Sequence, residues 1–106
     1  MKGLGNLTQL MKQAREIQAR MAQVQAELEQ RRYEGSAGGG MVVATVNGRQ
    51  ELLALQVERE VVNPDDIGML QDLIIAAVNQ ALKNSRTAAA EEMSKLTGGI
   101  SIPGLF

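Results

Sequence analysis

The sequence contains no cysteine, no histidine and no tryptophan, and aromatic residues make up 2% of it. Without cysteine there is no disulfide and no thiolate nucleophile or metal ligand, and without histidine there is no imidazole base or ligand. The scattered serine and threonine residues and the single tyrosine have no evident activating partner. We therefore interpret the chain as a non-enzymatic protein, with no metal, no cofactor and no small-molecule substrate expected.

Long apolar runs are also missing. No run approaches the ~18 residues that a membrane-spanning helix needs, and the first residues lack the basic, apolar and small-residue succession of an export signal. We expect a cytoplasmic protein with no membrane partner. A chain of 106 residues has room for one core, which must be built from Leu, Val, Ile, Met and Ala.

The formal net charge of −1 argues against strong binding to polyanions, but the charge is unevenly distributed. Residues 1–32 carry six Lys or Arg and three Glu, a net charge of +3. Residues 33–106 carry five Lys or Arg and nine Asp or Glu, a net charge of −4. This asymmetry indicates a basic element on an acidic body.

The first third of the chain predicts a long helix from about residue 6 to residue 31, a range without Gly or Pro. Apolar residues recur there at alternating spacings of three and four, an a/d heptad pattern. Such a helix is roughly 38 Å long, more than a three-stranded sheet can cover, so part of this stripe needs another partner. A second copy of the same helix is the economical candidate, and one helix lying across its own domain is the alternative. The stripe consists of Leu7, Leu10, Ala14, Ile17, Met21, Val24 and Leu28.

Residues 32–58 change to the alternating pattern of strands, which we expect at 32–37, 41–46 and 50–58. The glycines at 38–40 mark the first turn. Asn47-Gly48 favours a type I′ hairpin turn, in which both central residues have positive φ. The third strand carries apolar residues on both faces. We therefore expect one face of the sheet to pack under a helix and the other to be open to a second subunit.

The start of the last helix is predicted by Asn63-Pro64-Asp65-Asp66, with Asn63 as the N-cap and Pro64 at the first helical position. It should end at Leu96, with Gly98 as the C′ residue. The prediction is an α+β fold with the order α-β-β-β-α, in which a three-stranded antiparallel sheet lies between a long N-terminal helix and a C-terminal helix. Residues 1–98 form the domain and residues 99–106 a tail.

The basic residues of the first helix are candidates for binding nucleic acid. Lys12 and Arg15 lie away from the apolar stripe and Arg20 lies nearer to it, positions from which they could neutralise phosphates. Glu16, four residues from both Lys12 and Arg20, offers a different explanation, a chain of ion pairs on the helix surface. Because single-strand binders stack bases on aromatic rings, we expect any nucleic-acid ligand to be a duplex held by its backbone.

Several separated segments resemble the YbaB/EbfC family of bacterial nucleoid-associated proteins, and together they extend over essentially the whole chain. The resemblance implies a homodimer whose helices project like tweezer arms, with double-stranded DNA as ligand and a role in nucleoid organisation or gene regulation. It also implies a location on the nucleoid. The segments are Met11 to Ala14, Glu34 to Val42, Val46 to Gly48, Val61 to Asp66, Leu73 to Asn79, Lys95 to Gly99 and the Pro-Gly-Leu-Phe ending.

Carried over to this sequence, the resemblance makes Lys12, Arg15 and Arg20 the DNA-contact candidates, with Lys83 and Arg86 of the last helix as further ones. These choices depend on charge and position, because the family offers no single DNA-contact motif to map. The rival hypothesis is a protein-interaction adaptor, whose paired helices dock onto a DNA-processing or recombination protein. The near-neutral charge and the Gln- and Ala-rich helix surface fit that hypothesis at least as well.

Overall fold

The computed structural model describes residues 2–96, and it confirms the predicted α+β class and the order α-β-β-β-α. A short 3-10 helix adds one element before the last helix. The predicted domain boundary at residue 98 and the tail lie outside the described residues. The elements are α1 (Lys2–Gln30), β1 (Arg32–Ala37), β2 (Val42–Asn47), β3 (Leu52–Val57), η1 (Arg59–Val61) and α2 (Ile67–Leu96).

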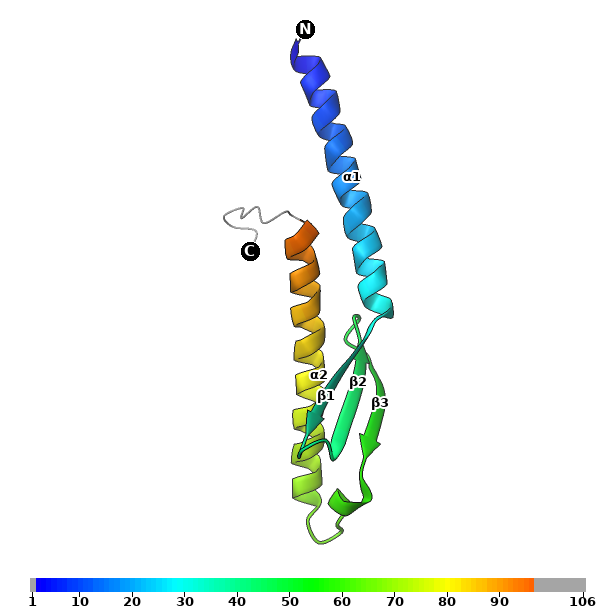
Figure 1. Ribbon diagram of the computed structural model, residues 1–106, viewed down its shortest axis with the longest axis vertical. Helices are drawn as coiled ribbons and strands as arrows, with labels where there is room; N and C mark the ends of the chain where they lie inside the picture. The colour runs from blue at the N-terminus through cyan, green and yellow to red at the C-terminus, as the bar shows by residue number, and fades with distance from the viewer. Residues whose placement is uncertain (1, 97–106) are drawn as a thin grey trace.

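The three strands form one antiparallel sheet in the order β1-β2-β3, and α2 runs along one face of it (Figure 1). In contrast, α1 extends beyond the end of the sheet, so the molecule is elongated, with principal extents of 79 × 25 × 16 Å. The alternative in which α1 lies across its own domain is therefore wrong. The second face of the sheet has no covering layer among the described elements.

The core lies between β2 and α2. Alternate residues of β2, namely Val42, Ala44 and Val46, are fully buried, as are Ala77 and Ala81 of α2. Small residues at these places let the helix approach the strands closely, which removes apolar surface from water without long side chains.

The closest approach is at Gly35 of β1. A Cβ atom built there would overlap the backbone carbonyl oxygen of Ala77 and the backbone nitrogen of Ala81. Gly35 is therefore required by the packing of α2 on β1, since any side chain would push the two elements apart.

The two turns of the sheet differ in which residues have positive φ. Gly38, Gly39 and Gly40 all have positive φ, as a glycine turn requires. The predicted type I′ turn at Asn47-Gly48 is wrong, because neither residue has positive φ and the left-handed residue is Gln50, with φ 64°. The loop has three residues and is closed by hydrogen bonds from Asn47 N to the Glu51 carbonyl (3.1 Å) and from Gln50 N to the Asn47 carbonyl (3.2 Å).

Tertiary contacts explain this change of turn. A Cβ on Gly48 would overlap the carbonyl of Leu28, so Gly48 serves the close approach of the end of α1. The Asn47 side chain organises the loop, since its Oδ1 accepts hydrogen bonds from Arg49 N (2.9 Å) and Glu51 N (3.1 Å). The loop is also linked to α2, because the buried Ser85 Oγ accepts a hydrogen bond from Gln50 Nε2 at 2.8 Å.

The start of α2 also differs from the prediction. Asn63 is not the N-cap and Pro64 is not in the helix, which begins at Ile67. Asn63 instead closes a turn, in which its Oδ1 accepts from Asp65 N at 3.0 Å and its carbonyl accepts from Asp66 N at 2.9 Å. The N-cap is Asp66, whose Oδ1 accepts from Met69 N at 3.2 Å.

Candidate nucleic-acid interface

The N-terminal part of α1 stands free of the rest of the molecule as an arm (Figure 1). The last turns of α1 contact α2 and lie against the β2–β3 hairpin, while the first half of α1 runs past the end of α2. Among the stripe residues, all of which are described, only Leu28 is buried and Val24 is half-buried. Leu7, Leu10 and Ile17 are 53%, 61% and 53% exposed. The chain itself therefore does not cover most of the stripe.

Lys12 and Arg15 are exposed on the side of α1 away from the stripe. At 3.6 residues per turn they lie about 170° and about 130° from its mean direction. Whatever covers the stripe would leave these two cations in solvent. Both remain candidates for DNA contacts.

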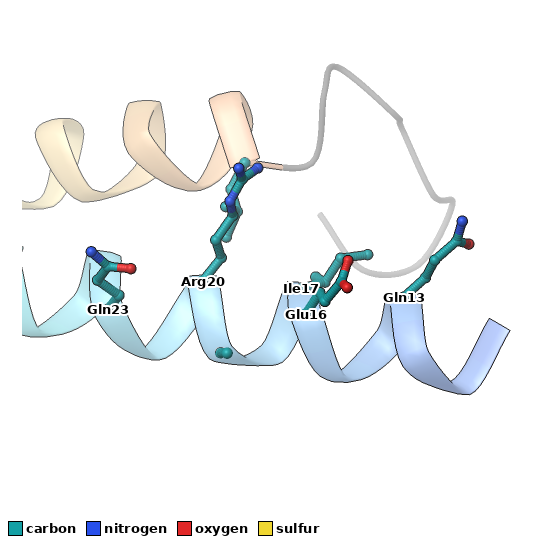
Figure 2. A pocket seen from close by; sticks show the side chains of 7 residues that line it. Gln13, Glu16, Ile17, Arg20 and Gln23 are labelled. Atoms are coloured by element: carbon teal, nitrogen blue, oxygen red, sulfur yellow. The ribbon is translucent and has the colours of Figure 1, made fainter. Parts of the chain in front are cut away.

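Arg20 lies on a third side of α1. Its side chain extends toward the C-terminal end of α2, across an open pocket between the two helices (Figure 2). Gln13 and Gln23 project from α1 toward the same space, and Leu96 lines it from α2. The pocket offers two amide groups and one guanidinium, which can donate to phosphate or carboxylate oxygens, but the carboxylate of Glu16 also lines it and would repel an anion.

The ion-pair explanation of the α1 charges finds no support in the structure. Within residues 2–96, Glu16 makes no ion pair with Lys12 or with Arg20, and Arg15 has none either. Their charges are therefore available to an external anion.

Two basic residues near the base of the arm are paired. Glu92 of α2 lies 3.6 Å from Arg31 Nη1 and 3.5 Å from Lys95 Nζ. The first pair joins the end of α1 to the last turns of α2 and so helps to set the direction of the arm. Because these side chains are partly exposed, each pair contributes at most about 1 kcal/mol.

Lys83 and Arg86 are exposed on the side of α2 that faces away from the sheet, about 160° and about 140° from its buried face. Arg86 lies about 15 Å along α2 from Leu96, which is level with the middle of α1. Within one chain the structure thus does not bring these two residues together with Lys12 and Arg15.

Lys95 was not among the candidates, although it lines a groove together with Arg20. The two residues are 75 positions apart in the sequence, so only the packing of α2 against α1 places them together. The pairing of Lys95 with Glu92 leaves Arg20 as the unpaired cation of that groove in the described part of the chain.

The structure offers few other binding features. No group of three or more Asp or Glu side chains within residues 2–96 is arranged to hold a metal ion. Neither of the two described α-helices is long and apolar enough to cross a membrane. The features that still need a functional explanation are the charged surface of α1 and the exposed apolar residues.

Comparison with known proteins gives consistent results. The sequence model of the YbaB/EbfC DNA-binding family matches residues 2–100. A nucleoid-associated protein of Clostridium novyi is 52% identical over 106 residues, which cover 100% of this chain and 93% of the relative. One of Syntrophobacter fumaroxidans is 56% identical over 95 residues, 90% of this chain and 86% of the relative.

Among solved structures, the fold is similar to the crystal structure of an uncharacterized protein from Helicobacter pylori. The TM-score is 0.64 and the sequences are 24% identical, with 87% of this chain and 92% of that chain covered. At this level of identity the likeness concerns the fold alone.

Proposed function

The chain belongs to the YbaB/EbfC DNA-binding family, and we propose that it binds duplex DNA as a homodimer, mainly through contacts to the phosphate backbone. In line with the sequence analysis, this is a family of DNA-binding proteins and not of enzymes. The observation that carries the finer proposal is that three exposed basic side chains of α1, Lys12, Arg15 and Arg20, have no ion-pair partner within residues 2–96.

The two sides of α1 suit two different partners. The exposed apolar stripe can pair with a second copy, because burial of Leu10 and Ile17 removes apolar surface from water. The side that carries Lys12 and Arg15 then still faces solvent and can reach phosphates. One helix would thus serve both self-association and DNA contact.

A homodimer would also have a higher affinity for DNA than a single chain. Three cations from one chain neutralise few phosphates, and each contact adds a separate, salt-dependent increment to the affinity. Two arms on one duplex double that number. Such contacts fix the position of the protein on DNA and carry no sequence information by themselves.

The cellular role follows from the relatives. Proteins that share half of this sequence over nearly all of its length are nucleoid-associated proteins. We place this chain on the nucleoid, where a dimer that binds many sequences would contribute to nucleoid organisation or gene regulation.

The exposed stripe also favours the rival function, in which α1 docks onto another DNA-processing protein. A pull-down after nuclease treatment separates the two. An adaptor retains its protein partner without DNA, whereas the proposed DNA-binding protein releases everything that it holds through DNA.

We expect duplex DNA to bind much more tightly than a single strand of the same length. Tyr33 packs against the core, and no aromatic ring is exposed among residues 2–96 on which an unpaired base could stack. A competition titration with matched duplex and single-stranded oligonucleotides measures the difference. Equal competition by the single strand would contradict duplex binding.

A further inference from the structure

Glu92 of α2 is the one carboxylate within residues 2–96 that pairs with two cations. Its Oε1 atom lies 3.6 Å from Arg31 Nη1 and 3.5 Å from Lys95 Nζ. The Glu92 side chain is 26% exposed, against 50% for Arg31 and 74% for Lys95. The carboxylate is thus the most deeply placed group of the three, and the two cations are nearer to solvent.

The charges of the groove between α1 and α2 nearly cancel. Arg20 and Lys95 contribute two positive charges to its lining, and Glu27 and Glu92 contribute two negative ones. Arg31 adds a cation beside the groove through its pair with Glu92. This group of five residues therefore has a net charge of +1 and attracts a polyanion only weakly. Without the charge of Glu92 the same group would have a net charge of +2.

The two cations held by Glu92 lie where they could extend the contacts of Arg20. Arg31 directly follows α1, and its N–H still donates to the Glu27 carbonyl at 3.2 Å, so it continues the helical turn. Arg20 and Arg31 lie on nearly the same side of α1, about 16 Å apart along the axis. Lys95 lines the groove together with Arg20 but projects from α2. A DNA backbone that contacts Arg20 thus has two more cations within its path.

We infer that Glu92 limits the affinity of this chain for DNA, because it neutralises two cations that would otherwise contact phosphates alongside Arg20. A cation that is paired with a carboxylate must give up or share that pair when it binds a phosphate, so it adds less to the affinity than a free cation. The carboxylate also repels the phosphates directly. The role of Glu92 rests on the proposed binding of duplex DNA and deepens it, since it identifies an acidic residue that opposes the basic residues of α1.

Glu92→Gln is expected to raise the affinity for duplex DNA at least about fivefold at low salt, since each exposed ion pair that competes with a phosphate is worth at most about fivefold. Glutamine has nearly the shape and the helix propensity of glutamate, so the variant loses the charge and little else. Two freed cations per chain also steepen the plot of log K against log salt concentration, by up to about 2 per chain. Fluorescence anisotropy with a labelled duplex at several salt concentrations measures both quantities, and circular dichroism checks the fold.

Glu91→Gln is the matched control. Glu91 is the neighbouring residue of α2, is exposed and makes no ion pair within residues 2–96. Both variants change the net charge by the same amount, so they differ only in the contacts of the lost carboxylate. The control should change the affinity at most about twofold and leave the salt dependence unchanged. An equal gain in both variants would attribute the effect to net charge and overturn the inference.

Arg31→Ala and Lys95→Ala, added to Glu92→Gln, show whether the freed cations cause the gain. The affinity of this triple variant should no longer exceed that of the wild type. A gain that persists without both cations overturns the inference. A lower affinity of Glu92→Gln than of the wild type also overturns it, because Glu92 would then act only by holding the arm in place.

The wild-type titration separates a failure of this inference from a failure of the proposed function. If the wild type binds duplex DNA with the salt dependence of phosphate contacts and Glu92→Gln binds no better, only the role of Glu92 is wrong. A wild-type chain that binds no duplex contradicts the proposed function, and the role of Glu92 with it.

Discussion

Replacement of Lys12, Arg15 and Arg20 together by alanine is expected to weaken binding to duplex DNA at least about 100-fold at moderate salt. Each cation that contacts a phosphate releases a condensed counterion, so a dimer without these six cations loses most of its electrostatic affinity. Alanine is the best helix former, and all three side chains are exposed, so α1 keeps its structure. Fluorescence anisotropy with labelled duplexes measures the change.

A control variant removes two cations from the body of each chain, Arg49→Ala and Arg59→Ala. Both residues are exposed and lie outside α1, Arg49 on the hairpin, where its Nε is 3.8 Å from Glu51 Oε1, and Arg59 on η1. Their loss should change the affinity only a few-fold. An equal loss in the control variant would show that net charge, and not the side chains of α1, determines binding.

The same triple variant also tests how DNA is read. Phosphate contacts bind all sequences, so the affinity for unrelated duplexes should fall by similar factors. If one sequence lost far more affinity than the others, these residues would be reading base edges.

Gly35→Ala is expected to lower the free energy of unfolding by about 1–3 kcal/mol, the usual cost of an overpacked core. The added methyl group would meet backbone atoms of Ala77 and Ala81, which cannot rotate away as a side chain could. The packing of α2 on β1 must loosen to admit it. Urea denaturation followed by circular dichroism measures the change.

Gly68→Ala provides the control for this prediction. Gly68 lies in the first turn of α2, and a Cβ there meets nothing within 4 Å. This variant should be neutral or stabilise the protein by up to about 1 kcal/mol, since alanine is the better helix former. If Gly35→Ala were as stable as Gly68→Ala, the close contact between β1 and α2 would not exist in solution.

Local patterns in the sequence predicted the elements well. The heptad spacing from Leu7 to Leu28 predicted α1, and the alternation between Arg32 and Val57 predicted the three strands. The triple glycine correctly predicted a turn, because positive φ is a property of the local backbone.

Features that depend on distant residues were predicted less well. Gly48 reads locally as half of a type I′ turn, but its role is to let Leu28 of α1 approach. Asn63 is a good capping residue, yet its side chain closes a turn and Asp66 caps the helix. In both places more than one local structure is favourable, and the tertiary packing selects between them.

The candidate site was predictable in part. The charges of Lys12 and Arg15, and their positions on the helix away from the apolar stripe, identify them as candidates from the sequence alone. The meeting of Arg20 with the end of α2, and the incomplete cover of β3, follow from how α2 is placed on the sheet. No local pattern encodes that placement, so these two features could not be derived before the fold was known.

The salt dependence of duplex binding tests the central claim most directly. If a dimer engages about 4 to 8 phosphates, a plot of log K against log salt concentration should be linear with a slope of roughly −4 to −7. Titrations of one duplex at several salt concentrations give this slope. Loss of most of it in the Lys12, Arg15 and Arg20 variant would assign it to α1. An affinity that stays constant between low and moderate salt would contradict the account.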